Sequence, residues 1–144
     1  MAQSHSFVPE PWSTTNEPEL DWLYNKGSVA QALAYSELFW PHFTEHDDCA
    51  FLLLDAEKYN SWMKTLEGNK TQVEATLNHR HIADLFEDGE SASHELLIAL
   101  GRILKQSWAA KLERDFPHRR FEVQFDDTPA ADASDYEITF YQQR

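Results

Sequence analysis

The sequence predicts an α+β fold in which four to five helices pack on a small, about three-stranded antiparallel sheet that ends in a C-terminal β-hairpin. Apolar residues recur at helical spacing through most of the middle of the chain. Near the C-terminus the pattern changes to alternation of apolar and polar residues, which is typical of half-buried strands. Only 4 glycines occur among 144 residues, which argues against a turn-rich sandwich or barrel.

Four segments have the apolar spacing of helices, together with residues that begin or end helices. Ser28 is a candidate N-cap for the first segment, which Pro41 ends, and Asp55 and Gly68 bound the second. Pro117 ends the fourth and longest segment. The predicted helices are residues 27–40, 55–68, 71–86 (with Thr71 and Glu74 as a capping box) and 91–116.

Two C-terminal segments form the predicted hairpin. Their inward-facing apolar positions are Phe121, Val123 and Phe125 in the first segment and Tyr136, Ile138 and Phe140 in the second. A lone hairpin is marginally stable, so a third strand is expected. The continuous apolar run CAFLLL, residues 49–54, suits a central strand that is covered on both faces.

The domain organisation predicted from the sequence is an extended N-terminal arm at residues 1–15 and a single α+β domain at residues 16–144. A chain of 144 residues is long enough for one self-supporting core. The first residues lack the basic and apolar regions of a signal peptide, and the single cysteine, Cys49, fits a reducing compartment. The longest strictly apolar run, Ala50 to Leu54, is far shorter than the roughly 20 residues of a membrane span. A cytoplasmic location is therefore expected.

The net charge of -13 restricts the classes of partner. A polyanion repels phosphate, so binding to nucleic acid or to an anionic membrane is not expected. The charge is uneven along the chain: residues 1–48 hold eight acidic residues and one basic residue, and residues 122–137 hold six acidic residues and no basic one. This distribution favours a basic protein partner, which an acidic face would attract by electrostatic steering.

The pentapeptide HFTEH, residues 42–46, matches the H-x-x-E-H pattern of one class of zinc peptidase. On a helix, His42 and His46 would share one face and could bind Zn²⁺ with Glu45 beside them. A metal-dependent hydrolase built on these three residues is therefore the alternative function. Coincidence is favoured, because the segment lies between a predicted helix and a predicted strand and no distant third ligand is recognised. The expected cofactor is accordingly none, with zinc as the alternative.

A second histidine cluster, His79 and His81, lies in the third predicted helix. Two residues apart on a helix, these imidazoles point about 200° away from one another and cannot bind one ion. His81 is in helical register with Leu77 and Leu85, which predicts a buried, hydrogen-bonded imidazole. The alternative pairs His81 with His94 or His46 of another segment.

Other catalytic motifs are absent from the sequence. It contains neither the G-x-S-x-G pattern of a serine hydrolase nor the glycine-rich loop that binds phosphates. Cys49 opens an apolar run, and burial of a thiol disfavours the reactive thiolate.

The sequence therefore favours a small, acidic, cytoplasmic protein-binding or regulatory domain without catalytic activity. This physical profile is also that of inhibitors and immunity-type proteins that neutralise a basic partner. Aromatic side chains within an acidic rim make effective contacts for such a partner. A homodimer, through an edge strand or an aromatic face, is left open. The candidate binding residues are Trp22, Tyr24, Trp40, Asp47, Asp48, Asp126 and Asp127.

Overall fold

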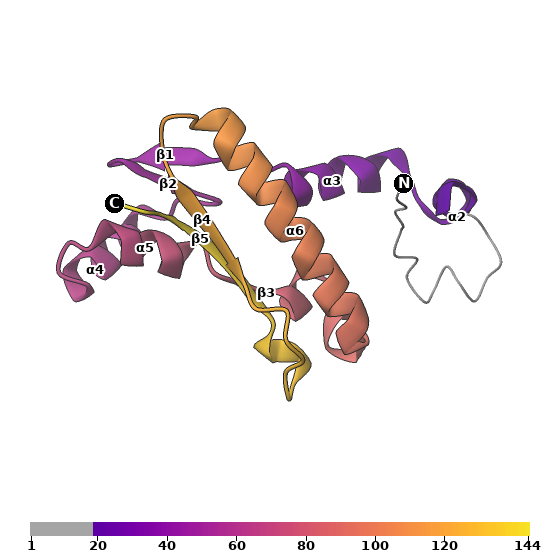
Figure 1. Ribbon diagram of the computed structural model, residues 1–144. Helices are drawn as coiled ribbons and strands as arrows, with labels where there is room; N and C mark the ends of the chain where they lie inside the picture. Colours follow the sequence, from indigo (N-terminus) through magenta and orange to yellow (C-terminus); the bar gives the residue numbers. More distant parts are fainter. Residues whose placement is uncertain (1–18) are drawn as a thin grey trace, which may run out of the picture. The chain divides into compact units, whose positions relative to one another are not determined.

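The computed structural model describes residues 19–144, and the predicted arm at residues 1–15 lies outside them (Figure 1). Contacts divide the described residues into two compact units, of which the first ends at Glu37 and the second spans residues 38–144. The first unit contains helix α2 (Glu19–Lys26) and most of helix α3 (Val29–Phe39). Ser28 caps α3 as predicted, because its Oγ accepts a hydrogen bond of 3.1 Å from the backbone N–H of Gln31. No residue of α3 is buried.

The second unit has the predicted α+β architecture. Its α-helices are α4 (Ala56–Thr65), α5 (Lys70–Leu77) and α6 (His94–Asp115). Short 3₁₀ helices are η1 (Ile82–Leu85), η2 (Gly89–Ser91) and η3 (Ala133–Asp135). Its strands are β1 (Thr44–His46), β2 (Cys49–Phe51), β3 (Arg80–His81), β4 (Phe121–Phe125) and β5 (Glu137–Gln142).

The larger sheet is antiparallel, with strand order β3-β5-β4. Strands β4 and β5 form the predicted C-terminal hairpin, and Val123 pairs with Phe140 in its register. Helix α6 covers one face of this sheet and α5 the other (Figure 1). The alternation of β5 follows these faces: Ile138 and Phe140 are buried in the core beside α6, whereas the Thr139 hydroxyl donates to the carbonyl of Ala75 on α5.

The main core lies between α6 and the β4–β5 hairpin. Trp108 is buried on α6, and its indole N–H donates to the carbonyl of Leu38 at 2.8 Å. Gly101 allows the ring of Phe125 to approach the helix, because a Cβ at this position would lie 2.1 Å from the ring. Four apolar residues of α6 are buried in this core: Leu97, Leu104, Trp108 and Leu112.

The predicted third strand, CAFLLL, is wrong in its partner and in its length. Only Cys49–Phe51 is extended, and it pairs with β1 in a separate two-stranded sheet. The tight turn at Asp47 and Asp48, with φ of 51° and 66°, closes this short hairpin. The third strand of the larger sheet is instead Arg80–His81, within the segment predicted as helix. Burial of all three β2 residues agrees with the expected covered strand.

The predicted helix at residues 71–86 is correct only in its first half. Helix α5 ends at Leu77, and its N-cap is Asn69 rather than Thr71. The capping-box interpretation is therefore wrong. Thr71 donates to the carbonyl of Gln142, and the Glu74 side chain enters the protein interior.

Glu74 and Asn78, one helical turn apart, join the two sheets. The carboxylate of Glu74 accepts from the backbone N–H of Ala50 on β2 and of Gln142 on β5, each at 2.9 Å. The Asn78 amide donates to the carbonyls of Ala50 and Phe140 and accepts from the N–H of Leu52. These side chains replace the backbone ladder that β2 and β5 do not form with one another.

Candidate functional site

The HFTEH segment is extended instead of helical. Glu45 and His46 lie on β1, and His42 precedes the strand. The Glu45 carboxylate pairs with Arg119 at 3.0 Å, and the His46 ring packs edge-on against Tyr59. The helical arrangement that the zinc alternative requires is therefore absent.

Asp47 and Asp48, predicted as binding residues, are exposed in the β1–β2 turn but have cationic neighbours. Asp47 accepts from the Tyr59 hydroxyl at 2.5 Å and from Lys70 at 3.4 Å. The Tyr59 hydrogen bond, followed by Lys70, holds the pKa of Asp47 below its ordinary value. Arg119 lies 3.6 Å from Asp48. Much of the negative charge of this turn is therefore compensated within the protein.

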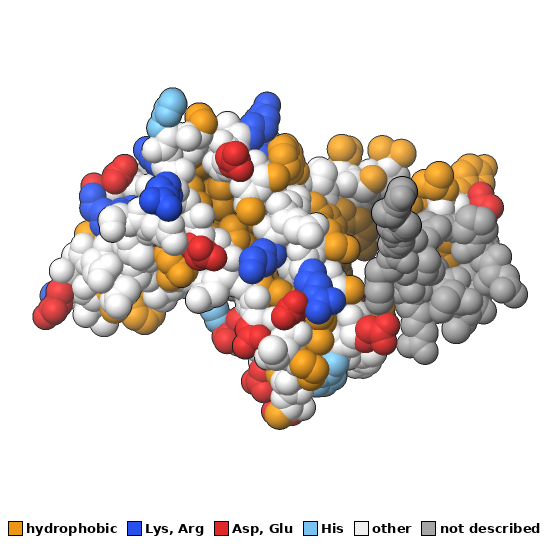
Figure 2. Space-filling view, viewed as in Figure 1, with side chains coloured by type: hydrophobic (Ala, Val, Ile, Leu, Met, Phe, Trp, Pro, Cys, Tyr) orange, Lys and Arg blue, Asp and Glu red, His pale blue; other side chains and the backbone are white. Residues whose placement is uncertain are grey.

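Asp126 and Asp127 belong to a larger acidic surface, of which the sequence indicated only the segment at residues 122–137. Helices η1 and η2 pack against η3, so the segments 84–90 and 126–135 are adjacent. Figure 2 shows acidic side chains gathered around the β4–β5 loop. We call this surface the acidic pole; its eight exposed carboxylates are Asp84, Glu87, Asp88, Glu90, Asp126, Asp127, Asp132 and Asp135. Arg102 of α6 pairs with Asp127 at 2.8 Å.

The aromatic residues predicted to contact a partner are divided between the two units and differ in exposure. Trp40 is partly exposed in the second unit, with the Lys111 ammonium 6.0 Å from its ring centroid. In the first unit, Trp22 is half-buried and Tyr24 is 87% exposed. Both line a hollow of about 590 Å³ formed by α2 and the first half of α3.

The first unit also exposes an apolar surface, which we call the α2–α3 patch. Figure 2 shows hydrophobic side chains on the surface of α3. All members of the patch are at least 45% exposed, and several of them line the hollow. They are Leu20, Leu23, Tyr24, Val29, Leu33 and Tyr35.

Cys49 is unsuited to nucleophilic chemistry, as its apolar neighbours predict. The residue is fully buried at the start of β2. Burial first, and then the nearby charge of Glu74, raise the pKa of the Cys49 thiol to about 11. The thiol is therefore protonated at neutral pH.

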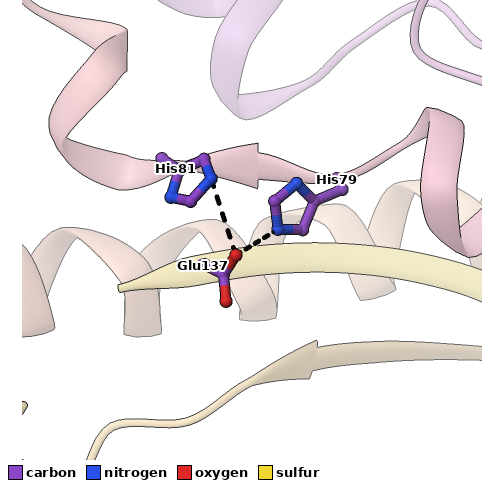
Figure 3. A group of neighbouring side chains, drawn as sticks. All are labelled: His79, His81 and Glu137. Carbon is purple, nitrogen blue, oxygen red and sulfur yellow. Dashed lines mark hydrogen bonds and ion pairs between the residues drawn. The ribbon is translucent and has the colours of Figure 1, made fainter. Parts of the chain in front are cut away.

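One group of three side chains within residues 19–144 has the composition and spacing of a metal site: His79, His81 and Glu137. Their ligand atoms all lie within 4.8 Å of one another. Nε2 of His79 is 2.5 Å, and Nε2 of His81 is 3.5 Å, from Oε1 of Glu137. Figure 3 shows both imidazoles pointing toward the carboxylate from the chain of β3. We call these residues the imidazole–carboxylate group.

The prediction that His79 and His81 diverge is wrong because this segment is extended. In a strand, residues two apart point to the same side, whereas on a helix they point in opposite directions. The prediction of a buried His81 fails for the same reason, since its side chain is 38% exposed. The alternating pattern H-R-H was the available signal, because it fits a strand as well as a helix.

The alternative partners of His81 are engaged elsewhere. Nδ1 of His94 lies 2.8 Å from the Tyr136 hydroxyl. His46 packs on Tyr59 in the other sheet. His81 contacts Glu137 and the backbone carbonyl of Ser134 instead.

Comparison with known proteins gives no relative from which a function could be transferred. No protein-family model matches the chain, and neither a curated protein nor a solved structure matches it. Within residues 19–144, no helix has both the length and the apolar character needed to cross a bilayer. Function therefore has to be inferred from the side chains of this chain.

Proposed function

We propose that this chain is a small protein-binding domain, of the regulatory or inhibitor type, that captures a basic protein. In this proposal the α2–α3 patch makes the apolar contact, and the acidic pole attracts the partner from a distance. The protein acts by contact and has no catalytic step.

The observation that carries the proposal is the exposure of the α2–α3 patch. Six large apolar side chains lie on the surface within residues 20–35, and α3 buries none of its residues. Helices of globular proteins normally bury an apolar stripe. Contiguous exposed apolar surface marks protein interaction sites, and aromatic residues such as Tyr24 are frequent energetic centres of interfaces.

The charge of the protein supports a basic partner. The net charge is -13, and the acidic pole concentrates eight carboxylates from two segments. Such a surface accelerates encounter with a positively charged protein and repels nucleic acids and anionic lipids. The compensated turn at Asp47 and Asp48 contributes less to this attraction than the pole does.

The test begins with capture of partners from an extract of the source cells on immobilised wild-type chain, followed by purification of a captured basic protein. Its association is then measured with the double variant Leu23→Ser, Tyr24→Ser. We expect at least about tenfold weaker binding, because interface centres of this kind are worth roughly 2 kcal/mol or more. Leu53→Ser is the matched control, because Leu53 is 72% exposed but lies in the other unit.

A second experiment tests whether the acidic pole accelerates association with the basic partner. Asp84→Lys with Glu87→Lys should slow association and flatten its salt dependence, whereas Glu57→Lys on α4 should have a smaller effect. Equal binding by the Leu23/Tyr24 variant and the wild type would refute the α2–α3 patch as the contact. Sedimentation of the purified chain is the remaining check. A homodimer that the same double variant dissolves would assign the patch to self-association and contradict the proposal.

A further inference from the structure

We propose that His79, His81 and Glu137 form a binding site for a divalent transition-metal ion of the zinc class, with solvent as the fourth ligand. This site lies outside the α2–α3 patch and is independent of the proposed function. Four features of the group support it: the backbone that positions the ligands, the tautomer of His81, the spacing of the ligand atoms, and their number and chemistry.

The backbone places the three side chains on one face of the β3–β5 pair. His81 is the direct cross-strand partner of Glu137 in the antiparallel register. Side chains opposite one another in such a pair have Cβ atoms only about 4.5–5.5 Å apart. His79 precedes His81 by two residues and therefore projects to the same side. Figure 3 shows this convergence on the Glu137 carboxylate.

The hydrogen bond of His81 fixes the tautomer that a metal ligand needs. Nδ1 of His81 lies 2.7 Å from the backbone carbonyl oxygen of Ser134. A carbonyl oxygen only accepts, so Nδ1 carries a proton, and in the tautomer that has its proton there Nε2 is the atom with the free lone pair. Nε2 is the atom that faces Glu137, at 3.5 Å. Ligand histidines in metalloproteins commonly donate their second N–H to a carbonyl in this way.

The spacing requires only small side-chain adjustments. Ligand atoms about 2.0–2.2 Å from a tetrahedral ion lie roughly 3.4 Å apart. The largest separation in the group is within 4.8 Å, and the His79–Glu137 separation of 2.5 Å would widen as the ion replaces the hydrogen bond between them. The side chains of His79, His81 and Glu137 are 36%, 38% and 47% exposed, so an ion and a bound water can reach them from solvent.

The ligand chemistry selects the class of ion. Two imidazoles and one carboxylate are typical of zinc and neighbouring transition metals, whereas magnesium and calcium prefer sites made of oxygen alone. Three protein ligands leave a fourth position for water. The neighbouring acidic pole, which includes Asp135 two residues before Glu137, raises the local concentration of cations.

The test is calorimetric titration of ZnCl₂ into the full chain after treatment with chelator. The wild type should bind one zinc ion, with a dissociation constant in the micromolar range or tighter. His79→Ala, His81→Ala and Glu137→Gln should each weaken binding by more than the roughly 10–100-fold that loss of a second-shell partner costs. Substitution with Co²⁺ should give the intense visible absorption of a tetrahedral ion.

His118→Ala is the matched control, because His118 is exposed in the turn between α6 and β4. It should bind zinc as tightly as the wild type. Circular dichroism checks that each variant is folded, and Glu137→Gln retains the volume of the side chain if an alanine variant does not fold. The proposal is overturned if the wild type does not bind zinc, if the three site variants bind as the wild type does, or if His118→Ala abolishes binding.

Discussion

Two glutamates of this protein, Glu74 on α5 and Glu137 on β5, have opposite surroundings. Glu74 is 0% exposed, and its two oxygens accept four hydrogen bonds, including one of 2.8 Å from Arg144 at the end of the chain. The other donors are the N–H groups of Ala50 and Gln142 and the side-chain amide of Gln142. Glu137 is nearly half exposed and faces the imidazoles of His79 and His81.

These surroundings make Glu74 a structural carboxylate, whereas the Glu137 carboxylate is free to bind a ligand. A buried charge is stable only where donors saturate it, and a saturated carboxylate has no lone pair left for a ligand. Glu74 therefore holds β2, β5 and the chain end together. Glu137 keeps oxygen lone pairs accessible from solvent, so an ion can bind there at little structural cost.

Glu74→Ala should destabilise the protein by about 2–6 kcal/mol, because two buried backbone N–H groups would lose their acceptor, at roughly 1–3 kcal/mol each. These are the N–H groups of Ala50 and Gln142, whereas the Arg144 guanidinium would keep the Thr71 hydroxyl and the Asp48 carbonyl as acceptors. Glu74→Gln should cost less, since its carbonyl oxygen still accepts. Urea unfolding followed by tryptophan fluorescence measures both changes.

Glu113→Ala is the control for this prediction, because Glu113 is an exposed helical glutamate on α6. Its expected effect is within about 0.5 kcal/mol, as for most surface substitutions. If Glu74→Ala and Glu113→Ala have equal unfolding free energies, Glu74 does not join the two sheets.

The reactivity of the Cys49 thiol reports on how well the region around Glu74 is shielded from solvent. Its thiol lies 3.6 Å from the Arg144 guanidinium, and burial raises its pKa from the ordinary 9.0 to about 11. At pH 8, alkylation by iodoacetamide should be at least about 100-fold slower in the folded protein than in urea, since two pKa units reduce the thiolate population by that factor.

The raised pKa of Cys49 also predicts that the free energy of unfolding decreases at alkaline pH. The folded state keeps the thiol protonated, so its contribution to stability is complete below pH 9.0 and is lost as the pH rises toward about 11. Urea unfolding of wild type and Cys49→Ala between pH 8 and pH 11 should show a steeper alkaline loss for the wild type. Equal rates of iodoacetamide alkylation in native buffer and in urea would contradict the first of these predictions, because the thiol would then be accessible and have an ordinary pKa.

Much of the fold follows from local patterns in the sequence. The Asp55 cap of α4 is confirmed by its hydrogen bond to the N–H of Lys58, and Gly68 has the positive φ, 79°, that its predicted role at a helix end requires. The alternation at residues 121–125 and 136–140 correctly predicted the hairpin; five of its six inward-facing apolar residues are buried, and Phe121 is partly buried. These features depend on neighbouring residues alone, so they can be read without knowledge of the tertiary structure.

The imidazole–carboxylate group could not be predicted in this way. Leu77, His81 and Leu85 fit a continuing helix, whereas α5 ends at Leu77. The Asn78 amide bonds to β2 and β5, and β5 then pairs with the extended chain at Arg80 and His81. The candidate site therefore depends on the register of a strand that lies more than fifty residues farther along the chain.

Glu137→Gln should give the smallest change. In buffer with chelator, its free energy of unfolding should lie within about 0.5 kcal/mol of the wild type, because polar contacts between exposed side chains contribute little. Addition of ZnCl₂ should then raise the melting temperature of the wild type and leave that of the variant unchanged, because an ion that binds only the folded state stabilises it. Differential scanning calorimetry measures both. A loss of several kcal/mol without metal would make Glu137 a structural carboxylate like Glu74, and the contrast between the two regions would fail.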